Sequence, residues 1–490
     1  MTGSLFQHRP WGQLFSKGLF LTLLFSLSFF SCAQRSTPSR LRESPPAGPI
    51  GLEEPALLKD APIPASPRLT LGKAVEEAIK MSPELDQIQQ RIGAASEQIK
   101  QVEASFYPRV LLAEEFNVTD NPVYALMNII NQRRLQPTVN FNDPGQQQNF
   151  STRIQGEWSL FEGGARWHER GAAISGRRSV EAELMAARNR LVAGVTETYY
   201  RWLQALSFIT VAEEALEAAR TDESLGEARF RVEMALPGDV ARLKARSAEM
   251  HGNLVSAKSN VRRLQAAMER LLARPIGPEE VPDPRGLSEN AVAEPESPGN
   301  PDSLVKQALE RRPEVAAARA MVDAAFQRVK SAQAGFLPKL STAAQLQWDS
   351  EDLGKSSDSW LVGIHASLPL FEGGLTLSKL AEAKARLREM QARGGQVELD
   401  IALEVRQAAL ALEEAFEKIQ VQEERRNWAR QALEEVRHQY RNEVAGVDSL
   451  LQAQVAWAQA EAACSAAHFE GSIARALLRQ SLGDFAEGIL

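Results

Sequence analysis

The sequence predicts a mainly α-helical protein with a small β part, in which one plan of long antiparallel helices and a β-hairpin occurs twice. Two proline-free stretches, 161–236 and 370–490, are rich in residues that favour helices. Shorter segments of alternating apolar and polar residues stand just before both stretches. The motif SLFEGG at 159–164 and the motif PLFEGG at 369–374 mark this change of period twice, 210 residues apart.

The composition excludes several classes of protein. Lys and Arg number 56 against 63 Asp and Glu, and this net charge of −7 disfavours a protein that wraps nucleic acid. Two cysteines are too few for a disulfide scaffold or a multi-cysteine metal site, and the histidines form no zinc-binding pattern. Gly354-Lys355-Ser356 lacks the first glycine of a phosphate-binding loop. We therefore expect no enzyme, no metal and no cofactor.

The first 31 residues are typical of a secretory signal peptide. Their apolar run, from Leu19 to Phe30, is too short to span a membrane as a helix. A serine and then Cys32 follow at once, which resembles a bacterial lipoprotein cleavage site, so Cys32 is the expected lipidation site and a candidate for palmitate. The alternative is an ordinary signal peptide cut near Ala33. Residues 32–67 form a proline-rich leader.

The repeat defines the remaining organisation as a first copy at 68–273, a connection at 274–303 and a second copy at 304–490. Seven prolines in the connection exclude a continuous helix there. Matching residues are 230 positions apart before the hairpins and 210 apart after them, so the first copy holds 20 extra residues. We place them in the polar segment 119–149 and expect a loop, because loops tolerate insertions.

Each copy is expected to contain one very long helix, at 165–233 and at 375–443. At 1.5 Å per residue each would be about 100 Å long, which is more than a globular domain of this size can enclose. Apolar residues recur at spacings of three and four, which indicates a packing stripe. After a short turn, antiparallel return helices are expected at 239–272 and 449–482.

The expected strands lie at 109–118 and 150–160 in the first copy and at 339–348 and 360–370 in the second. Their alternation gives one apolar and one polar face, with Gln155, Glu157 and His365 on the polar face. Glu114 falls on the apolar face without an evident reason. The alternative is a pair of water-soluble hairpins packed on the helices, since short barrel strands give weak signals.

A lipid anchor beside such strands favours a sheet in a bilayer, where open edges would leave backbone N–H and C=O groups unpaired. Four strands are too few to close a barrel, for which about eight is the minimum. Several chains must therefore contribute to one barrel.

The motifs together resemble the TolC-like outer-membrane efflux family over nearly all of the mature length. Besides the two FEGG motifs, they are SPEL at 82–85 with RPEV at 312–315, FYPRV at 106–110 with FLPKL at 336–340, and the segments that begin at Arg229 and Gln439. The resemblance implies a homotrimer with a twelve-stranded transmembrane β-barrel and a periplasmic α-helical barrel. It makes Phe161, Gly163, Gly164, Phe371, Gly373 and Gly374 the strand–helix junction motif.

The resemblance also assigns roles to the two helix turns, as the tips that meet a periplasmic adaptor protein. The matching tip residues are Arg231, Glu233, Ala235, Arg441, Glu443 and Ala445. Glu233 and Glu443 stand where the family usually has glycine. Asp239, Asp448 and Ser449 are the candidate gate, because converging carboxylates can repel one another and attract cations. The alternative for Asp239 is an ordinary helix cap.

The function that the resemblance implies is an outer-membrane channel of a tripartite efflux or export system. Its partners would be an inner-membrane transporter, a periplasmic adaptor and outer-membrane lipid. Type I protein secretion is the alternative, followed by a lipid-tethered coiled-coil scaffold without a pore. The sequence leaves open whether the cargo is a drug, a metal or a protein, and which class of pump supplies it.

Overall fold

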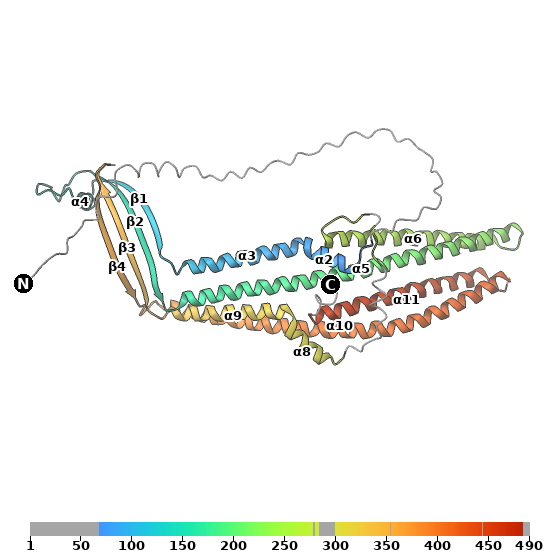
Figure 1. Ribbon diagram of the computed structural model, residues 1–490. Coiled ribbons are helices and arrows are strands. Elements are labelled where there is room, and N and C mark those ends of the chain that lie inside the picture. Colours follow the sequence, from blue (N-terminus) through green and yellow to red (C-terminus); the bar gives the residue numbers. More distant parts are fainter. Residues whose placement is uncertain (1–67, 278–279, 284–298, 353, 443, 484–490) are drawn as a thin grey trace, which may run out of the picture. The chain divides into compact units, whose positions relative to one another are not determined.

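The computed structural model describes residues 68–277, 280–283, 299–352, 354–442 and 444–483 (Figure 1). The expected signal peptide, the lipidation site Cys32, the whole leader at 32–67 and the tip residue Glu443 lie outside the described residues. Much of the connection 274–303 also lies outside them.

Both repeats follow the same order of elements, helix–helix–strand–strand–helix–helix, with one additional helix in the first. The first repeat contains α2 (Leu71–Met81), α3 (Pro83–Ala104), β1 (Arg109–Thr119), α4 (Pro122–Asn131), β2 (Gln147–Glu162), α5 (Ala165–Arg231) and α6 (Pro237–Leu272). The second contains α8 (Pro301–Arg311), α9 (Pro313–Ala334), β3 (Lys339–Ser350), β4 (Ser357–Ser367), α10 (Leu375–Arg441) and α11 (Val447–Ser481).

The long helices α5 and α10 have 67 residues each, which corresponds to about 100 Å of helix. Helix α5 packs along α3 and α6 of its own repeat and along α9 and α11 of the other. Helix α10 packs along α9 and α11. The shorter helices therefore lie beside the long ones, and all four strands join the helices at the same end (Figure 1). None of the helices among the described residues is long and apolar enough to cross a membrane.

The largest buried cluster lies where α5 meets the start of the first repeat. The Tyr199 hydroxyl donates to the carbonyl oxygens of Leu69, at 2.9 Å, and Asp283, at 3.0 Å. Leu69 also bridges to Pro282, and its N–H donates to Val281 O. Burial raises the pKa of Tyr199 to about 12, so the hydroxyl stays a donor at neutral pH. One side chain thus fastens the connection between the repeats to the middle of α5.

The four strands form one antiparallel sheet in the order β1-β2-β3-β4, so β1 and β4 are its edges. The register sets the apolar residues of neighbouring strands opposite one another, as in Ile154↔Leu346 and Leu346↔Trp360. Gln155↔Gln345 and Ser341↔His365 face the other side. Glu114 does lie on the apolar face, where its cross-strand neighbour Thr152 donates a hydrogen bond to it at 2.5 Å.

Strand β4 ends at Ser367, three residues before the expected end of the strand at 370. Its counterpart β2 continues to Glu162, because Phe161 and Glu162 pair with β3 beyond a bulge. Strand β4 pairs with β3 alone, and that pairing stops at Ser367↔Lys339 where β3 begins. The expectation for residues 368–370 is therefore wrong for the single chain, which offers them no neighbouring strand.

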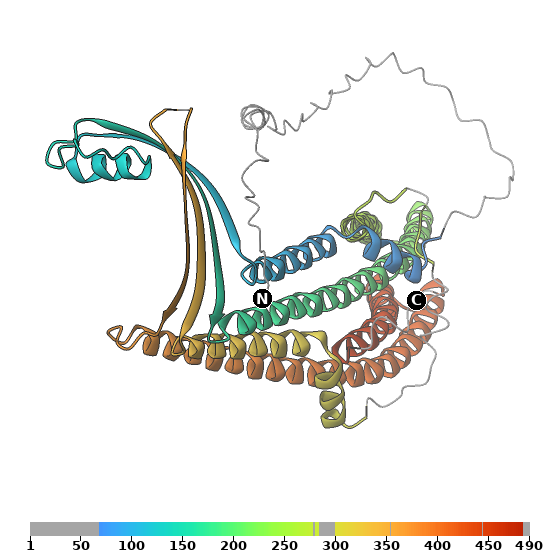
Figure 2. The same ribbon diagram turned by 60° about the vertical axis from the view of Figure 1, so that its left-hand side comes forward.

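We expected the insertion in the first repeat to be a loop, but it contains the packed helix α4. Asn121 caps this helix by accepting hydrogen bonds from Val123 N and Tyr124 N, and Pro122 occupies its first turn. Its residues Ala125, Asn128 and Ile129 are buried. Figure 2 shows α4 beside the ends of β1 and β2 that lie away from the long helices.

The Tyr199 bonds generate a first prediction. We expect Tyr199→Phe to lower the free energy of unfolding by roughly 1–3 kcal/mol, because the hydrogen bonds from this buried hydroxyl to the Leu69 and Asp283 carbonyls are lost. Tyr200→Phe is the matched control, since it removes the same group from the neighbouring residue without touching these carbonyls. Chemical unfolding followed by circular dichroism measures both. Equal loss in the two variants would contradict this role for Tyr199.

Candidate functional site

The paired glycines of the FEGG motif make the turn from strand to long helix possible. Gly163 and Gly164 have φ of +65° and +88°, and Gly373 and Gly374 have φ of +60° and +88°, all left-handed values that suit glycine. Gly164 and Gly374 are the N-cap residues of α5 and α10. A Cβ at Gly163 would also lie only 2.6 Å from Ala334 O, so the first junction packs against the second repeat. Phe161 and Phe371 of the same motifs are exposed.

Aromatic residues gather at the first junction. The rings of Phe106 and Trp167 are 4.7 Å apart, and the Trp158 indole N–H donates to Phe106 O at 2.9 Å. Trp167 and Tyr107 are nevertheless exposed, although both are large. His168 is bonded through Nδ1 to Gln327 Oε1 at 2.9 Å, which gives it a structural partner. Exposed Trp and Tyr at the end of an apolar sheet are typical of a membrane–water interface.

The first helix turn places an L-amino acid in a glycine conformation. Helix α5 ends at Arg231 and α6 begins at Pro237, and between them Glu233 has a φ of +63°. The Met234 N–H donates to Arg229 O at 2.9 Å and closes the turn. Glycine is preferred at such a position because it lacks a Cβ. Arg231 and Glu233 are exposed, and Ala235 is half-buried.

In the second turn, between α10 and α11, Val444 N donates to Gln439 O at 2.9 Å. Arg441 is exposed and Ala445 half-buried, as at the first turn.

The candidate gate residues do not form one group. Asp239 lies in the first turn of α6, whose N-cap residue is Leu236, so Asp239 is not the capping residue. A carboxylate there still interacts favourably with the helix dipole.

The two turns are fastened to each other by Arg229, a residue that the sequence interpretation did not single out. Its guanidinium donates to Tyr440 O at 3.1 Å and to Arg441 O at 2.9 Å, and lies 4.7 Å from the centre of the Tyr440 ring. Tyr440 is buried in a cluster with Leu243, Val447 and Leu450, which come from both return helices. Arg229 thus covers carbonyls at the end of α10 and joins the two hairpins.

Ion pairs add to this connection. Arg242 on α6 contacts both carboxylate oxygens of Asp448 on α11 at 2.7 Å, so Asp448 of the candidate gate is neutralised within its own chain. Lys244 pairs with Glu227 at 2.7 Å and ties α6 to α5. This pairing raises the pKa of Lys244 and lowers the pKa of Glu227, because each ion stabilises the charged form of the other. Ser449 is exposed beside Asp448.

A buried carboxyl, that of Asp222, lies on α5 shortly before the helix ends at the first turn. Asp222 on α5 accepts a hydrogen bond from the Gln454 side chain on α11. Burial raises the pKa of Asp222 above its ordinary value, while Arg437 and Gln454 act in the opposite direction. Arg229, Arg242 and Asp222 each bond across the two hairpins, and none of these contacts lies between residues close in sequence.

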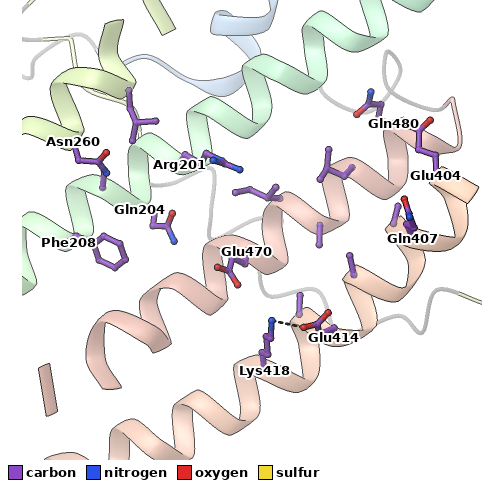
Figure 3. A pocket seen from close by; sticks show the side chains of 18 residues that line it. Arg201, Gln204, Phe208, Asn260, Glu404, Gln407, Glu414, Lys418, Glu470 and Gln480 are labelled. Atoms are coloured by element: carbon purple, nitrogen blue, oxygen red, sulfur yellow. Dashed lines mark ion pairs between the residues drawn. The ribbon is translucent and has the colours of Figure 1, made fainter. Parts of the chain in front are cut away.

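A groove of about 690 Å³ lies between the two hairpins, with α5, α6, α10 and α11 as its walls (Figure 3). Four of its charged side chains form ion pairs: Lys418 with Glu414 at 2.6 Å, Arg201 with Glu197 at 2.6 Å, and Glu404 with Arg312 at 2.6 Å. Within the described part of the chain, no three His, Cys, Asp or Glu side chains are placed to hold a metal ion. The groove is lined by apolar side chains such as Phe208, Leu264 and Ile473 together with amides and charged groups.

The helices and sheet find their counterpart in a known family. The family model described as outer membrane efflux protein matches residues 74–274 and 304–484, which are most of the two repeats. The chain belongs to this family.

Individual relatives agree with this membership. The alkaline protease secretion protein AprF of Pseudomonas aeruginosa is 28% identical over 225 residues, which cover 44% of this chain and 47% of AprF. The protein CyaE of Bordetella pertussis is 26% identical over 416 residues, which cover 84% of this chain and 83% of CyaE. The chain spans less than half the length of the first curated relatives that it matches, AprF among them.

Solved structures show the same fold. The outer membrane channel CmeC of Campylobacter jejuni has a TM-score of 0.71 at 18% identity, covering 86% of this chain and 87% of CmeC. A membrane protein from Pseudomonas aeruginosa has a TM-score of 0.72 at 22% identity, covering 84% of this chain and 93% of that protein. The expected duplicated fold, mainly helical with a four-stranded sheet, is confirmed.

The turn at Glu233 generates a second prediction. We expect Glu233→Gly to stabilise the chain by up to about 1 kcal/mol, because glycine adopts a φ of +63° without a clashing Cβ. Glu233→Ala is the control, since it removes the charge but keeps the Cβ. Hydrogen exchange of the α5 and α6 ends reports the local stability. A gain in the alanine variant as large as in the glycine variant would mean that charge, and not backbone conformation, matters.

Proposed function

We propose that this chain is the outer-membrane channel of a tripartite efflux or export system, which passes substrates from an inner-membrane pump and a periplasmic adaptor to the exterior. The observation that carries the proposal is the four-stranded sheet, with one exposed apolar face and no neighbouring strand at either edge among the described residues. The names of the relatives, which include efflux and secretion proteins, support this class of function.

The strands have the dimensions and chemistry of membrane strands. They contain 11 to 16 residues, whereas a tilted transmembrane strand needs about 9–11. The exposed residues Val110, Leu112, Trp360, Val362 and Ile364 lie on the apolar face. Lipid would cover this face, and the aromatic residues at the junction would lie at headgroup level. The polar face would then line a water-filled passage.

The internal repeat supports closure by further copies. Strand β2 of the first repeat pairs with β3 of the second, so β4 of one chain can pair with β1 of the next in the same way. The exposure of side chains along the long helices also supports a neighbouring copy. Ala193 and Tyr200 of α5 are buried, whereas Leu403 and Leu410, 210 residues later on α10, are exposed. A neighbouring copy would bury them. Three copies give twelve strands, the number that the family resemblance implies.

The repeat even fixes the register of the proposed contact. Gln155 pairs with Gln345 inside the chain, and their equivalents in the other repeats are His365 and Glu115. His365 of one copy would therefore lie opposite Glu115 of the next. This pairing would extend β4 through residues 368–372, as β2 extends through Glu162.

In this arrangement the channel does no chemistry of its own. The pump supplies the energy, and the helix tips form a closed periplasmic entrance. Docking of the adaptor would replace the contacts of Arg229 and Arg242 with intermolecular ones and let the hairpins separate. Asp239 and Ser449 lie beside these contacts and would then line the entrance, while Arg231 and Arg441 remain available to the adaptor.

We further propose that Cys32 carries the lipid anchor in the outer membrane.

Protein secretion is the second candidate, and the similarity to the secretion proteins AprF and CyaE is the observation in its favour. Both candidates share the pore and differ in cargo. Measuring drug and metal sensitivity together with protein secretion in a deletion strain distinguishes them. The scaffold without a pore is separated from both by conductance measurements.

The tip contacts generate a third prediction, which also tests the pore. Purified protein in planar bilayers should conduct, and Arg242→Gln should increase the conductance. An exposed ion pair contributes about 0.2–1 kcal/mol, so the open population should rise up to roughly five-fold per protomer. Arg430→Gln is the matched control, because Arg430 is also exposed and pairs with Glu434 on the same helix. Silent bilayers for the unchanged protein would contradict the channel.

The register generates a fourth prediction. A chain that carries His365→Cys and Glu115→Cys should form oxidised oligomers that survive denaturing gel electrophoresis. The control pair is His365→Cys with Phe116→Cys, because Phe116 lies on the opposite face of β1. Monomers from both pairs, or equal yields of oligomer, would exclude this pairing between copies.

A further inference from the structure

The inserted helix α4 lies on the polar face of the sheet. Asn128 donates to the Asn117 side chain of β1 at 2.8 Å, and Gln132, just after the helix, donates to the Asn149 side chain of β2 at 2.9 Å. Asn117 and Asn149 pair with each other in the register and belong to the polar face. One side of α4 is thus held by amide–amide hydrogen bonds.

These amides continue into a network across the sheet. Asp349 of β3 is 1% exposed and accepts from Asn149 at 2.7 Å and from Gln347 at 2.8 Å. Gln345 donates to Gln347 at 2.7 Å, and Gln155 donates to Gln345 at 3.2 Å. A buried carboxylate that is bonded by neutral amides on both oxygens holds its position firmly. The base beneath α4 is therefore ordered.

The segment after α4 is fastened to the far side of the sheet as well. The Ser357 hydroxyl donates to Gln132 O at 3.0 Å, and Arg133 donates to Asp358 O at 2.8 Å, both at the start of β4. Arg134 pairs with Glu351 at 2.8 Å. These bonds reach β1, β2, β4 and the connection between β3 and β4. They hold α4 at the end of the sheet that lies away from the long helices.

The other side of α4 is apolar and exposed. Val123, Tyr124, Met127 and Ile130 are 69%, 67%, 50% and 42% exposed, at spacings that place them on one helical stripe. This stripe is on the polar side of the sheet, so lipid that covers the apolar face cannot reach it. Within a closed barrel the polar side is the interior, where the stripes of the other copies are apolar surfaces that this stripe can meet.

We propose that the α4 helices of the assembled copies meet through this stripe and form an apolar collar that narrows the outer mouth of the pore. The inference rests on the proposed function, because only a closed barrel turns the polar face inward. The occupant of the stripe is a second copy of this chain, continuous with the contact between β4 and β1. An apolar constriction restricts ions by excluding water, so the collar would limit charged solutes more than its width alone.

The proposal generates a fifth prediction, tested on the full chain in planar bilayers. The double variant Met127→Ser and Ile130→Ser should raise single-channel conductance at least two-fold, because water can fill a polar constriction. Val110→Ser is the control, since Val110 is also an exposed apolar residue but lies on the apolar face near the other end of β1. It should leave conductance unchanged.

A cross-linking experiment tests the contact itself. Met127→Cys should give dimers and trimers with a short bis-maleimide, whereas Val118→Cys, at the same end of the sheet but on its apolar face, should give none. Wild-type conductance in the serine variant, or monomers in the Met127→Cys protein, would overturn the collar. A protein that forms no channels at all would instead overturn the proposed function, so the two failures are distinguishable.

Discussion

The rest of the molecule depends on the two edges of its sheet. Backbone N–H and C=O groups that face hydrocarbon without partners cost several kcal/mol each, so a membrane sheet must be closed. Because the described residues supply four strands, the closure that we propose has to come from other copies. The same contact would bury Leu403 and Leu410, whose equivalents in α5 are already covered. Strand and helix exposure thus point to the same neighbour.

The repeats are alike in backbone and different in their surroundings. Gly163 and Gly373 share a left-handed φ, yet only at Gly163 would a Cβ meet Ala334 O within the chain. The second junction has the geometry for a contact that the first already makes. A duplicated chain therefore uses one kind of interface twice, once inside the protomer and once, as we propose, between protomers. The use of one kind of interface twice would account for the presence of the FEGG motif in both copies.

The sequence was sufficient for what depends on local chemistry. The lack of proline, together with a composition that favours helices, predicted α5 and α10 to within two residues at their ends. The alternation of apolar and polar residues predicted the strands. Helix α4 was missed because residues 119–149 were interpreted by composition, although Asn121-Pro122 before an apolar run is a helix start. Arg229 bonds to residues more than 200 positions away, and no local pattern contains such a contact.

The two ends of the proposed pore are held by different chemistry. At the tips, exposed ion pairs and one guanidinium join the hairpins, and such contacts are weak, screened by salt and replaceable by charges on a partner. At the outer end, α4 rests on buried amides around Asp349 and presents apolar side chains. A charged adaptor surface can compete for the first set of contacts and has no means of competing for the second. In the channel that we propose, the tips are therefore where a pump would control the passage, and the collar would act as a fixed limit on what leaves.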